Sequence, residues 1–202
     1  LNTAHTSLPS GISQNWPKGT PVTLGVLAHL MISISDNTAT DHLLHTVGRD
    51  LVEAASPNSL KPFISTREMF LLKLHPNADT LRSKYISGDE RAKRAVLEEL
   101  KAFKLEKLNT LSEPNHIKEI EWHVSTKELC HAITQIGFHP SLTINPGLLT
   151  NRQWDQVAYK GGSEPGVLNY THLARAKKSK RVYCISATIN DAQENVKTGE
   201  FT

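Results

Sequence analysis

Apolar positions recur at helical spacing through much of the first two-thirds of the chain. The apolar run from Leu24 to Ile32 predicts a helix, for which Thr23 offers an N-cap. Apolar residues between Ala39 and Val47 predict a second helix, and Gly48 suits the position just past its end. A short third helix is expected from Asp50 to Ala55.

Three polar residues, Ser35, Asp36 and Asn37, separate the first two predicted helices. Short polar side chains bond to nearby backbone groups and leave helical geometry readily, so we expect a tight turn here. Two interpretations are open for this turn. It is either a plain helix–helix connection with Asp36 or Asn37 as the N-cap, or a functional turn whose polar side chains are held between apolar flanks.

Three Ser-x-x-Glu sequences mark further helix starts. In such a capping box the serine bonds the amide of the third helical residue, while the glutamate reaches back to the serine amide. The boxes begin at Ser65, Ser87 and Ser125. Their helices are expected to run to about residues 74, 103 and 136. The segment 105–122 lacks a strong period and is expected to be a long loop with short helical pieces.

Helical spacing gives way to strand patterns towards the end of the chain. β-rich runs divided by turn signals cover Gln156–Lys160, Gly166–Ala174 and Arg181–Ile189. We therefore predict an α+β protein with a helical subdomain over residues 1–146, followed over residues 147–202 by an antiparallel β meander. The charged connection between the last two strands is typical of a solvated hairpin tip.

Composition narrows the function classes only a little. The chain has 202 residues and a net charge of +3, without an aromatic and basic stripe, which gives no support for nucleic-acid binding. No run of 18 apolar residues is present, so no membrane span is expected. His42 and His45 share one helix face without a third ligand, and neither a metal nor another cofactor is expected.

Cys130 and Cys184 lie far apart in the sequence, one in a helical pattern and one in a strand pattern. Both have apolar neighbours, and neither has a metal-binding or redox spacing. Two buried free thiols are the preferred interpretation, and a disulfide stays open.

The Ser-Asp-Asn turn has a companion motif downstream. Residues 157–171 read as a strand that ends in Lys-Gly-Gly, beginning at Lys160, then a turn and another strand. Ser-Asp-Asn on a helical turn, followed far downstream by such a Lys-Gly-Gly strand, resembles the outer motifs of penicillin-recognising serine enzymes. The segment Val22–Leu44 is similar to the class A β-lactamase family. The resemblance implies a β-lactamase-like fold that this chain contains in part.

The resemblance also implies roles for the residues of the turn. The Ser35 hydroxyl would relay a proton to the leaving nitrogen of the substrate. Asn37 would hydrogen-bond the substrate's side-chain amide, and Asp36 would point inward and hold the turn. Lys160 would stabilise an anionic substrate through its charge and tune the nearby hydroxyls.

The strand beyond Lys160 would bind the substrate along its backbone. Gly161 and Gly162 carry no side chain, so a ligand can lie against the strand there. Ser163 would supply a backbone N–H to the oxyanion hole, since a strand amide is fixed in advance.

Two features of the family are missing. No serine of the sequence has a lysine three positions later, whereas the family's nucleophile lies in Ser-x-x-Lys. We therefore expect the chain to be the C-terminal portion of a longer protein, whose N-terminal segment carries the nucleophile and packs against these residues. The family's deacylating glutamate lies in Glu-x-x-Leu-Asn, but Leu105 holds its place before Leu108 and Asn109. Glu121, next to Trp122, is a weak candidate for this base, since burial near an aromatic ring would raise its pKa. A salt-bridged or solvated glutamate is the commoner case and the preferred interpretation.

These observations give two hypotheses. The first is a serine hydrolase that acts on a β-lactam or a related amide or ester, such as a D-Ala-D-Ala-like substrate, through an acyl-enzyme. The resemblance implies a periplasmic or secreted protein of β-lactamase or D-alanyl-D-alanine carboxypeptidase type. The second is a catalytically silent protein of the same fold that binds a cell-wall peptide or a protein partner. A Ser-x-x-Lys in the upstream sequence favours the enzyme.

Overall fold

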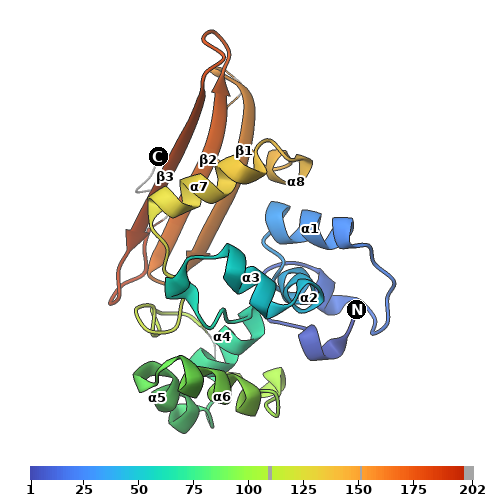
Figure 1. Ribbon diagram of the computed structural model, residues 1–202, viewed down its shortest axis with the longest axis vertical. Helices are drawn as coiled ribbons and strands as arrows, with labels where there is room; N and C mark the ends of the chain where they lie inside the picture. The colour runs from blue at the N-terminus through green and yellow to red at the C-terminus, as the bar shows by residue number, and fades with distance from the viewer. Residues whose placement is uncertain (109–110, 151, 198–202) are drawn as a thin grey trace.

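The computed structural model of the chain describes residues 1–108, 111–150 and 152–197. Within them, eight α-helices precede three antiparallel strands, as the α+β prediction required. Most helices before residue 101 gather towards one end of the molecule, whereas the sheet forms the other end with the two last helices beside it (Figure 1). No helix of these ranges is both long enough and apolar enough to cross a membrane. Short 3₁₀ helices lie at Thr3–His5, Ser13–Asn15, Asn58–Leu60 and Leu105–Lys107.

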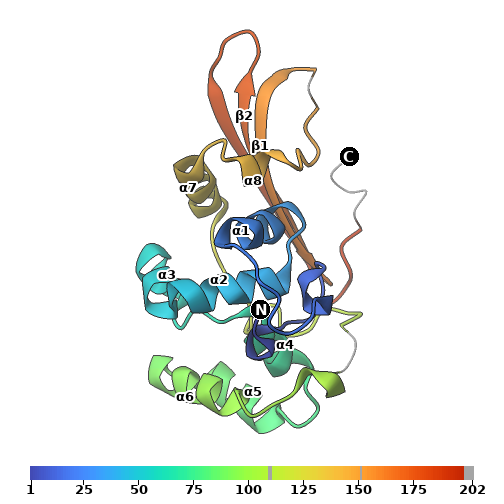
Figure 2. The same ribbon diagram turned by 90° about the vertical axis from the view of Figure 1, so that its right-hand side faces the viewer.

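The first helices begin where their capping residues predict. They are α1 (Leu24–Ser33), α2 (Asn37–Val47) and α3 (Arg49–Ala55). The Thr23 side chain accepts the amide of Val26, and the Asp36 side chain accepts the amide of Ala39. Gly48 ends α2 with a φ of 92°, a conformation that favours glycine. Helix α1 packs between α2 and the short helix α8 (Pro140–Thr143) near the sheet (Figure 2).

The next three helices are α4 (Thr66–Leu74), α5 (Asp79–Ser87) and α6 (Glu90–Leu100). Ser65 and Glu68 form the expected capping box of α4. The expected box at Ser87 is wrong, since Ser87 is the last residue of α5, a helix that the sequence pattern did not predict. Asp89 caps α6 instead by accepting the amide of Ala92. Aspartate caps a helix about as well as serine, and Asp89 directly precedes the residues with helical spacing.

The main apolar core lies around α4. Its members come from α4, α5, α6 and the segments just before α4 and after α6. They include Leu71, Leu72, Val96, Leu100 and Ile120, all at most 2% exposed. Because α4 is buried on nearly every side, its sequence shows little polar–apolar alternation. This core supports the α1–α2 turn through contacts between α2 and α4.

The strands are β1 (Trp154–Glu164), β2 (Val167–Ala176) and β3 (Val182–Asn190), paired in that order. The three expected strands are confirmed, with longer bounds at both ends of β1. The register places Lys160 opposite Thr171 and Gly162 opposite Asn169. Because side chains alternate along a strand, Ala158, Lys160, Gly162 and Glu164 share one face of β1.

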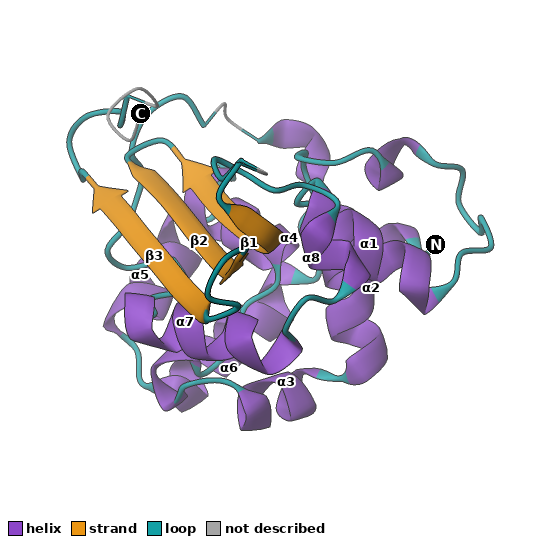
Figure 3. Ribbon diagram, turned by 90° about the horizontal axis from the view of Figure 1, so that it is seen from above, coloured by secondary structure: helices purple, strands orange, loops and turns teal. Residues whose placement is uncertain are grey.

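Helix α7 (Thr126–Ile136) starts at the expected Ser125 capping box and packs against β2 and β3 (Figure 3). Cys130 of α7 and Cys184 of β3 form a disulfide, with Cα atoms 5.7 Å apart. The preferred prediction of two free thiols is therefore wrong. Apolar neighbours suit either state of the cysteines, and only the packing of α7 on β3 brings the two residues together.

Candidate active site

Two segments that lie far apart in the sequence meet at Ser35 and Lys160. Lys160 Nζ donates a hydrogen bond to Ser35 Oγ at 2.6 Å and another to the carbonyl oxygen of Gly161. Ser35 has a φ of 54°, which is uncommon for a residue other than glycine. This conformation takes the chain sharply out of α1, so the serine side chain can meet the strand. Backbone strain of this kind is often found at functional sites.

Asp36 holds the turn from inside the protein. Its buried carboxylate accepts hydrogen bonds from Ile12 N (2.8 Å), Ser13 N (2.9 Å) and Ser13 Oγ (2.6 Å), besides the capping bond from Ala39 N (2.8 Å). Burial raises the pKa of Asp36, but these hydrogen bonds outweigh it and leave the pKa below its ordinary value. Gly11 is also required here, because a Cβ would come within 2.3 Å of the Asp36 carboxyl carbon.

The same N-terminal segment binds the other residues of the turn. Asn37 donates from Nδ2 to the carbonyl oxygen of Leu8 at 3.1 Å, and from its backbone N to that of Ser10 at 3.1 Å. The Ser10 hydroxyl in turn donates to the carbonyl oxygen of Ser35. The side-chain amide of Asn37, which the resemblance assigns to substrate, thus bonds within the protein in this structure.

Lys160 is a partly buried cation. Burial lowers the pKa of its ammonium group to about 8, so the group is mostly charged at neutral pH and loses its proton just above it. A buried cation fixed beside a hydroxyl stabilises negative charge at that point more strongly than it would in water. The pair can therefore bind an anion and assist proton transfer through Ser35.

The two glycines after Lys160 have different surroundings. At Gly162 a Cβ would meet no atom within 4 Å, so open space lies beside the strand. At Gly161 a Cβ would lie 2.0 Å from Tyr159 Oη, so the tyrosine ring already occupies that side. A side chain would thus have room at Gly162 and would collide with Tyr159 at Gly161, and substrate binding at the two glycines stays a prediction. Ser163 is exposed and lines a cavity of about 340 Å³ at the end of β1.

Glu121, the weak candidate base, lies in an ion pair. Its carboxylate contacts Lys73 Nζ, and the same nitrogen lies 2.9 Å from both carboxylate oxygens of Glu164. The salt-bridged alternative thus describes Glu121 in this structure. Leu105 begins a 3₁₀ helix, whereas Asn109 of the partial Glu-x-x-Leu-Asn match lies outside the described residues.

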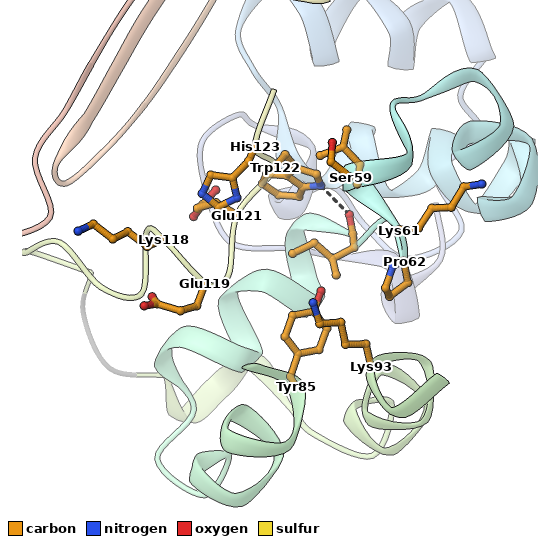
Figure 4. Close-up of a pocket in the computed structure, with 12 residues that line it drawn as sticks. Ser59, Lys61, Pro62, Tyr85, Lys93, Lys118, Glu119, Glu121, Trp122 and His123 are labelled. Carbon is orange, nitrogen blue, oxygen red and sulfur yellow. Dashed lines mark hydrogen bonds between the residues drawn. The ribbon is translucent and has the colours of Figure 1, made fainter. Parts of the chain in front are cut away.

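Glu121 also lines a second cavity of about 190 Å³ (Figure 4). Trp122 and Tyr85 lie on opposite sides of this space, and Trp122 Nε1 donates to the carbonyl oxygen of Ile64 at 3.1 Å. Its walls come from α5, α6 and residues 59–64 and 118–123, so the cavity lies apart from the contact between Ser35 and Lys160.

Potential metal ligands do not gather around the site. Across the described residues, no group of three or more His, Cys, Asp or Glu side chains is placed to hold a metal ion. His42 uses both ring nitrogens within the protein, since Nε2 accepts the amide of Asn2 and Nδ1 lies 2.8 Å from the carbonyl oxygen of Thr38. The His45 ring stacks on His5 with centroids 3.8 Å apart.

Comparison with known proteins identifies the relationship. Residues 2–60, which include the Ser-Asp-Asn turn, match the model of the β-lactamase enzyme family. Residues 2–60 are therefore similar to the β-lactamase enzyme family. The resemblance read from the turn and its flanks is thereby confirmed over this part of the chain. A search of the curated proteins found no match.

Three solved structures are similar to this chain. PBP-A has a TM-score of 0.53 and 13% identity, over 96% of this chain and 62% of that one. A β-lactamase from Sphaerobacter thermophilus has a TM-score of 0.46 and 20% identity, over 94% and 62%. A β-lactamase from Burkholderia phymatum has 0.45 and 16%, over 96% and 66%. The likeness to PBP-A shows a shared fold. This chain spans about 62% of the length of PBP-A.

Sequence reasoning missed three residues of the contacts described above, namely Lys73, Glu164 and Ser13. Lys73 could have been noticed, since a lysine within the apolar run Phe70–Leu74 demands a buried partner. Glu164 could have been noticed because it lies four positions after Lys160 and so shares its strand face. Ser13 gave no signal, because its contact with Asp36 depends on how the N-terminal segment folds over the turn.

Proposed function

We propose that the chain provides part of the active site of a serine hydrolase that acts on β-lactams or related amides and esters through an acyl-enzyme. The contact between Lys160 and Ser35 carries this proposal, because it joins the two motifs that the resemblance assigns to one site. The family match over residues 2–60 supports it.

In this proposal each motif residue has a distinct task. Ser35 relays a proton to the leaving nitrogen, and Lys160 attracts the anionic group of the substrate and favours this transfer. The substrate lies along β1 at Gly162, and the Ser163 amide donates to the oxyanion. Asn37 exchanges its bond with Leu8 for one to the substrate's amide, while Asp36 keeps the turn in place.

The nucleophile is assigned to a part of the protein outside these 202 residues. The sequence contains no Ser-x-x-Lys, and the chain spans only about 62% of the length of PBP-A. A deacylating base is left unassigned among the described residues, since Glu121 is held by Lys73. We therefore expect slow release of the acyl group compared with its formation.

Hydrolysis of a chromogenic cephalosporin by the longest natural form of the protein tests these roles. Ser35→Ala and Lys160→Met should each lower kcat/KM by about 100-fold, because each removes proton transfer or fixed charge. Lys180→Met is the matched control, since Lys180 is an exposed lysine of the β2–β3 connection that pairs with Asp155 of β1. Equal activity of all four proteins would contradict the assigned roles.

The lack of Ser-x-x-Lys within the sequence also favours a second candidate. This is a catalytically silent protein of the same fold that binds a cell-wall peptide or a protein partner. It predicts saturable binding of a D-Ala-D-Ala peptide by the longest natural form, weakened by Lys160→Met, without hydrolysis or a covalent adduct. Turnover of any β-lactam or ester substrate by that form would exclude it.

A further inference from the structure

Lys73 is a fully buried lysine with two carboxylate partners. Its Nζ contacts Glu121 and lies 2.9 Å from both carboxylate oxygens of Glu164. The three residues come from α4, from the segment between α6 and α7, and from the last position of β1. Because a buried charge without a partner is very unfavourable, these contacts hold three separate elements together.

The cluster and the candidate site share one face of one strand. Lys160 and Glu164 are four residues apart, so both side chains point to the same side of β1. Lys160 is bonded to Ser35 at the α1–α2 turn, and Glu164 is bonded to Lys73 on α4. Gly162, with open space at its Cα, lies midway between these two anchored side chains.

We propose that Lys73, Glu121 and Glu164 act together as positioning residues for the candidate site. They hold the Gly162–Ser163 backbone against the helical part of the molecule, while Lys160 fixes the other end of the segment. The inference rests on the proposed function in one respect, since the Ser163 amide is the proposed oxyanion donor. None of the three side chains is assigned a contact with substrate.

The charge balance of the cluster makes this anchor sensitive to pH. Two carboxylates face one ammonium group, so the cluster carries a net negative charge when all three are ionised. Burial and repulsion from Glu121 raise the pKa of Glu164, Lys73 opposes the rise, and the net result is a pKa of about 7. Protonated Glu164 leaves the cluster neutral below that pH, whereas its ionisation above it places an unbalanced charge in the interior.

Other charged groups near the cluster have partners of their own. Arg82 of α5 reaches the Lys73 carbonyl oxygen at 3.3 Å and pairs with Asp79. Lys118 lies in the segment that carries Glu121, and its charge helps to lower the pKa of Asp191, just after β3. The charged groups that act on the Glu164 carboxyl among the described residues are therefore Lys73 and Glu121.

Hydrogen exchange followed by mass spectrometry tests the anchor without requiring activity. Peptides that span residues 158–168 of the longest natural form would be compared between about pH 6 and pH 8. In the wild type, exchange corrected for its intrinsic rate should rise about tenfold over this range, as the strand end loosens. Glu164→Gln should abolish the rise, because glutamine mimics the neutral acid.

Two further variants and a control complete the experiment. Glu121→Gln should weaken the rise, since Lys73 then balances a single carboxylate, and Lys73→Met should raise exchange at every pH. Lys180→Met, which removes an exposed ion pair of the same sheet, should behave as the wild type. Should Lys73→Met fail to fold, the two glutamine variants carry the test.

The pH step tests whether ionisation of Glu164 loosens the end of β1. The inference would be overturned if exchange in Glu164→Gln rose between pH 6 and pH 8 as much as in the wild type. It would also be overturned if both glutamine variants exchanged as the wild type does at each pH. Penicillin acylation is measured separately on the same protein. The expected exchange pattern without acylation would contradict the proposed function and leave the anchor standing.

Discussion

Lys160 Nζ lies 2.6 Å from Ser35 Oγ, although the two residues are 125 positions apart in the sequence. This contact joins the α1–α2 turn to the sheet at the two motifs that the sequence singled out. It places a partly buried cation against the hydroxyl of a serine whose backbone is left-handed.

Asp36→Asn should destabilise the protein by about 3 kcal/mol, because one accepting oxygen is replaced by an amide that faces backbone and hydroxyl donors. The loss should appear as a lower midpoint in urea unfolding with an unchanged slope. Asp155→Asn, at an exposed ion pair on β1, is the control and should change the midpoint little. An Asp36→Asn protein with the urea midpoint of the wild type would show that the turn does not depend on this carboxylate.

The disulfide between Cys130 and Cys184 should contribute to stability. Its cysteines are 54 positions apart, and closing a loop of that size in the unfolded chain corresponds to about 4 kcal/mol in the chain-entropy model. Unfolding by urea with and without reductant measures the effect. A variant with both cysteines replaced by serine should unfold at the midpoint of the reduced protein and ignore reductant. Identical midpoints for oxidised and reduced wild type would contradict the prediction.

Acid should weaken the contact between the N-terminal segment and α2. Burial, together with His45, His42 and Arg67, lowers the pKa of His5 from 6.5 to about 4. The unfolded chain therefore binds a proton at His5 more readily than the folded chain does. The stability that neutral His5 contributes is complete above pH 6.5 and is lost as the pH falls through 4. Thermal melts at pH 7.5 and 4.5 should show a smaller loss for His5→Gln than for the wild type. Equal losses would remove His5 from this account.

Activity should fall above about pH 8 if Lys160 acts through its charge. Burial lowers the pKa of Lys160 to about 8, and only its protonated form attracts an anionic substrate. The pH profile of kcat/KM for a chromogenic cephalosporin, measured on the longest natural form, tests this. Lys160→Arg keeps its charge at all these pH values, so any activity it retains should lack the alkaline decline. Activity that rises through pH 8 would instead point to neutral Lys160 as a base.

Local sequence signals predicted much of the helical part. Thr23, Ser65 and Ser125 cap the helices that they were expected to cap, since a capping interaction involves only neighbouring residues. The start of α6 was misplaced because Ser87 and Asp89 both suit an N-cap, and only the folded chain distinguishes them. The strands followed from turn signals and alternation, although their ends did not.

Contacts between distant segments were beyond the reach of such signals. The disulfide depends on α7 packing against β3, which apolar neighbours of a cysteine do not specify. The burial of Asp36 by Ser13 depends on the path of the N-terminal segment, and the Lys73 cluster depends on three elements meeting. The motif residues could be proposed as a set only through family resemblance, because each motif alone is short.

Intact mass of the longest natural form after incubation with a penicillin tests the central claim most directly. A serine hydrolase with this site should gain the mass of one penicillin, on a serine outside the 202 residues, and Lys160→Met should slow the gain by about 100-fold. Lys180→Met should acquire the adduct at the wild-type rate. If no adduct forms at any time point and no penicillin is hydrolysed, the claim of an acyl-enzyme hydrolase is contradicted.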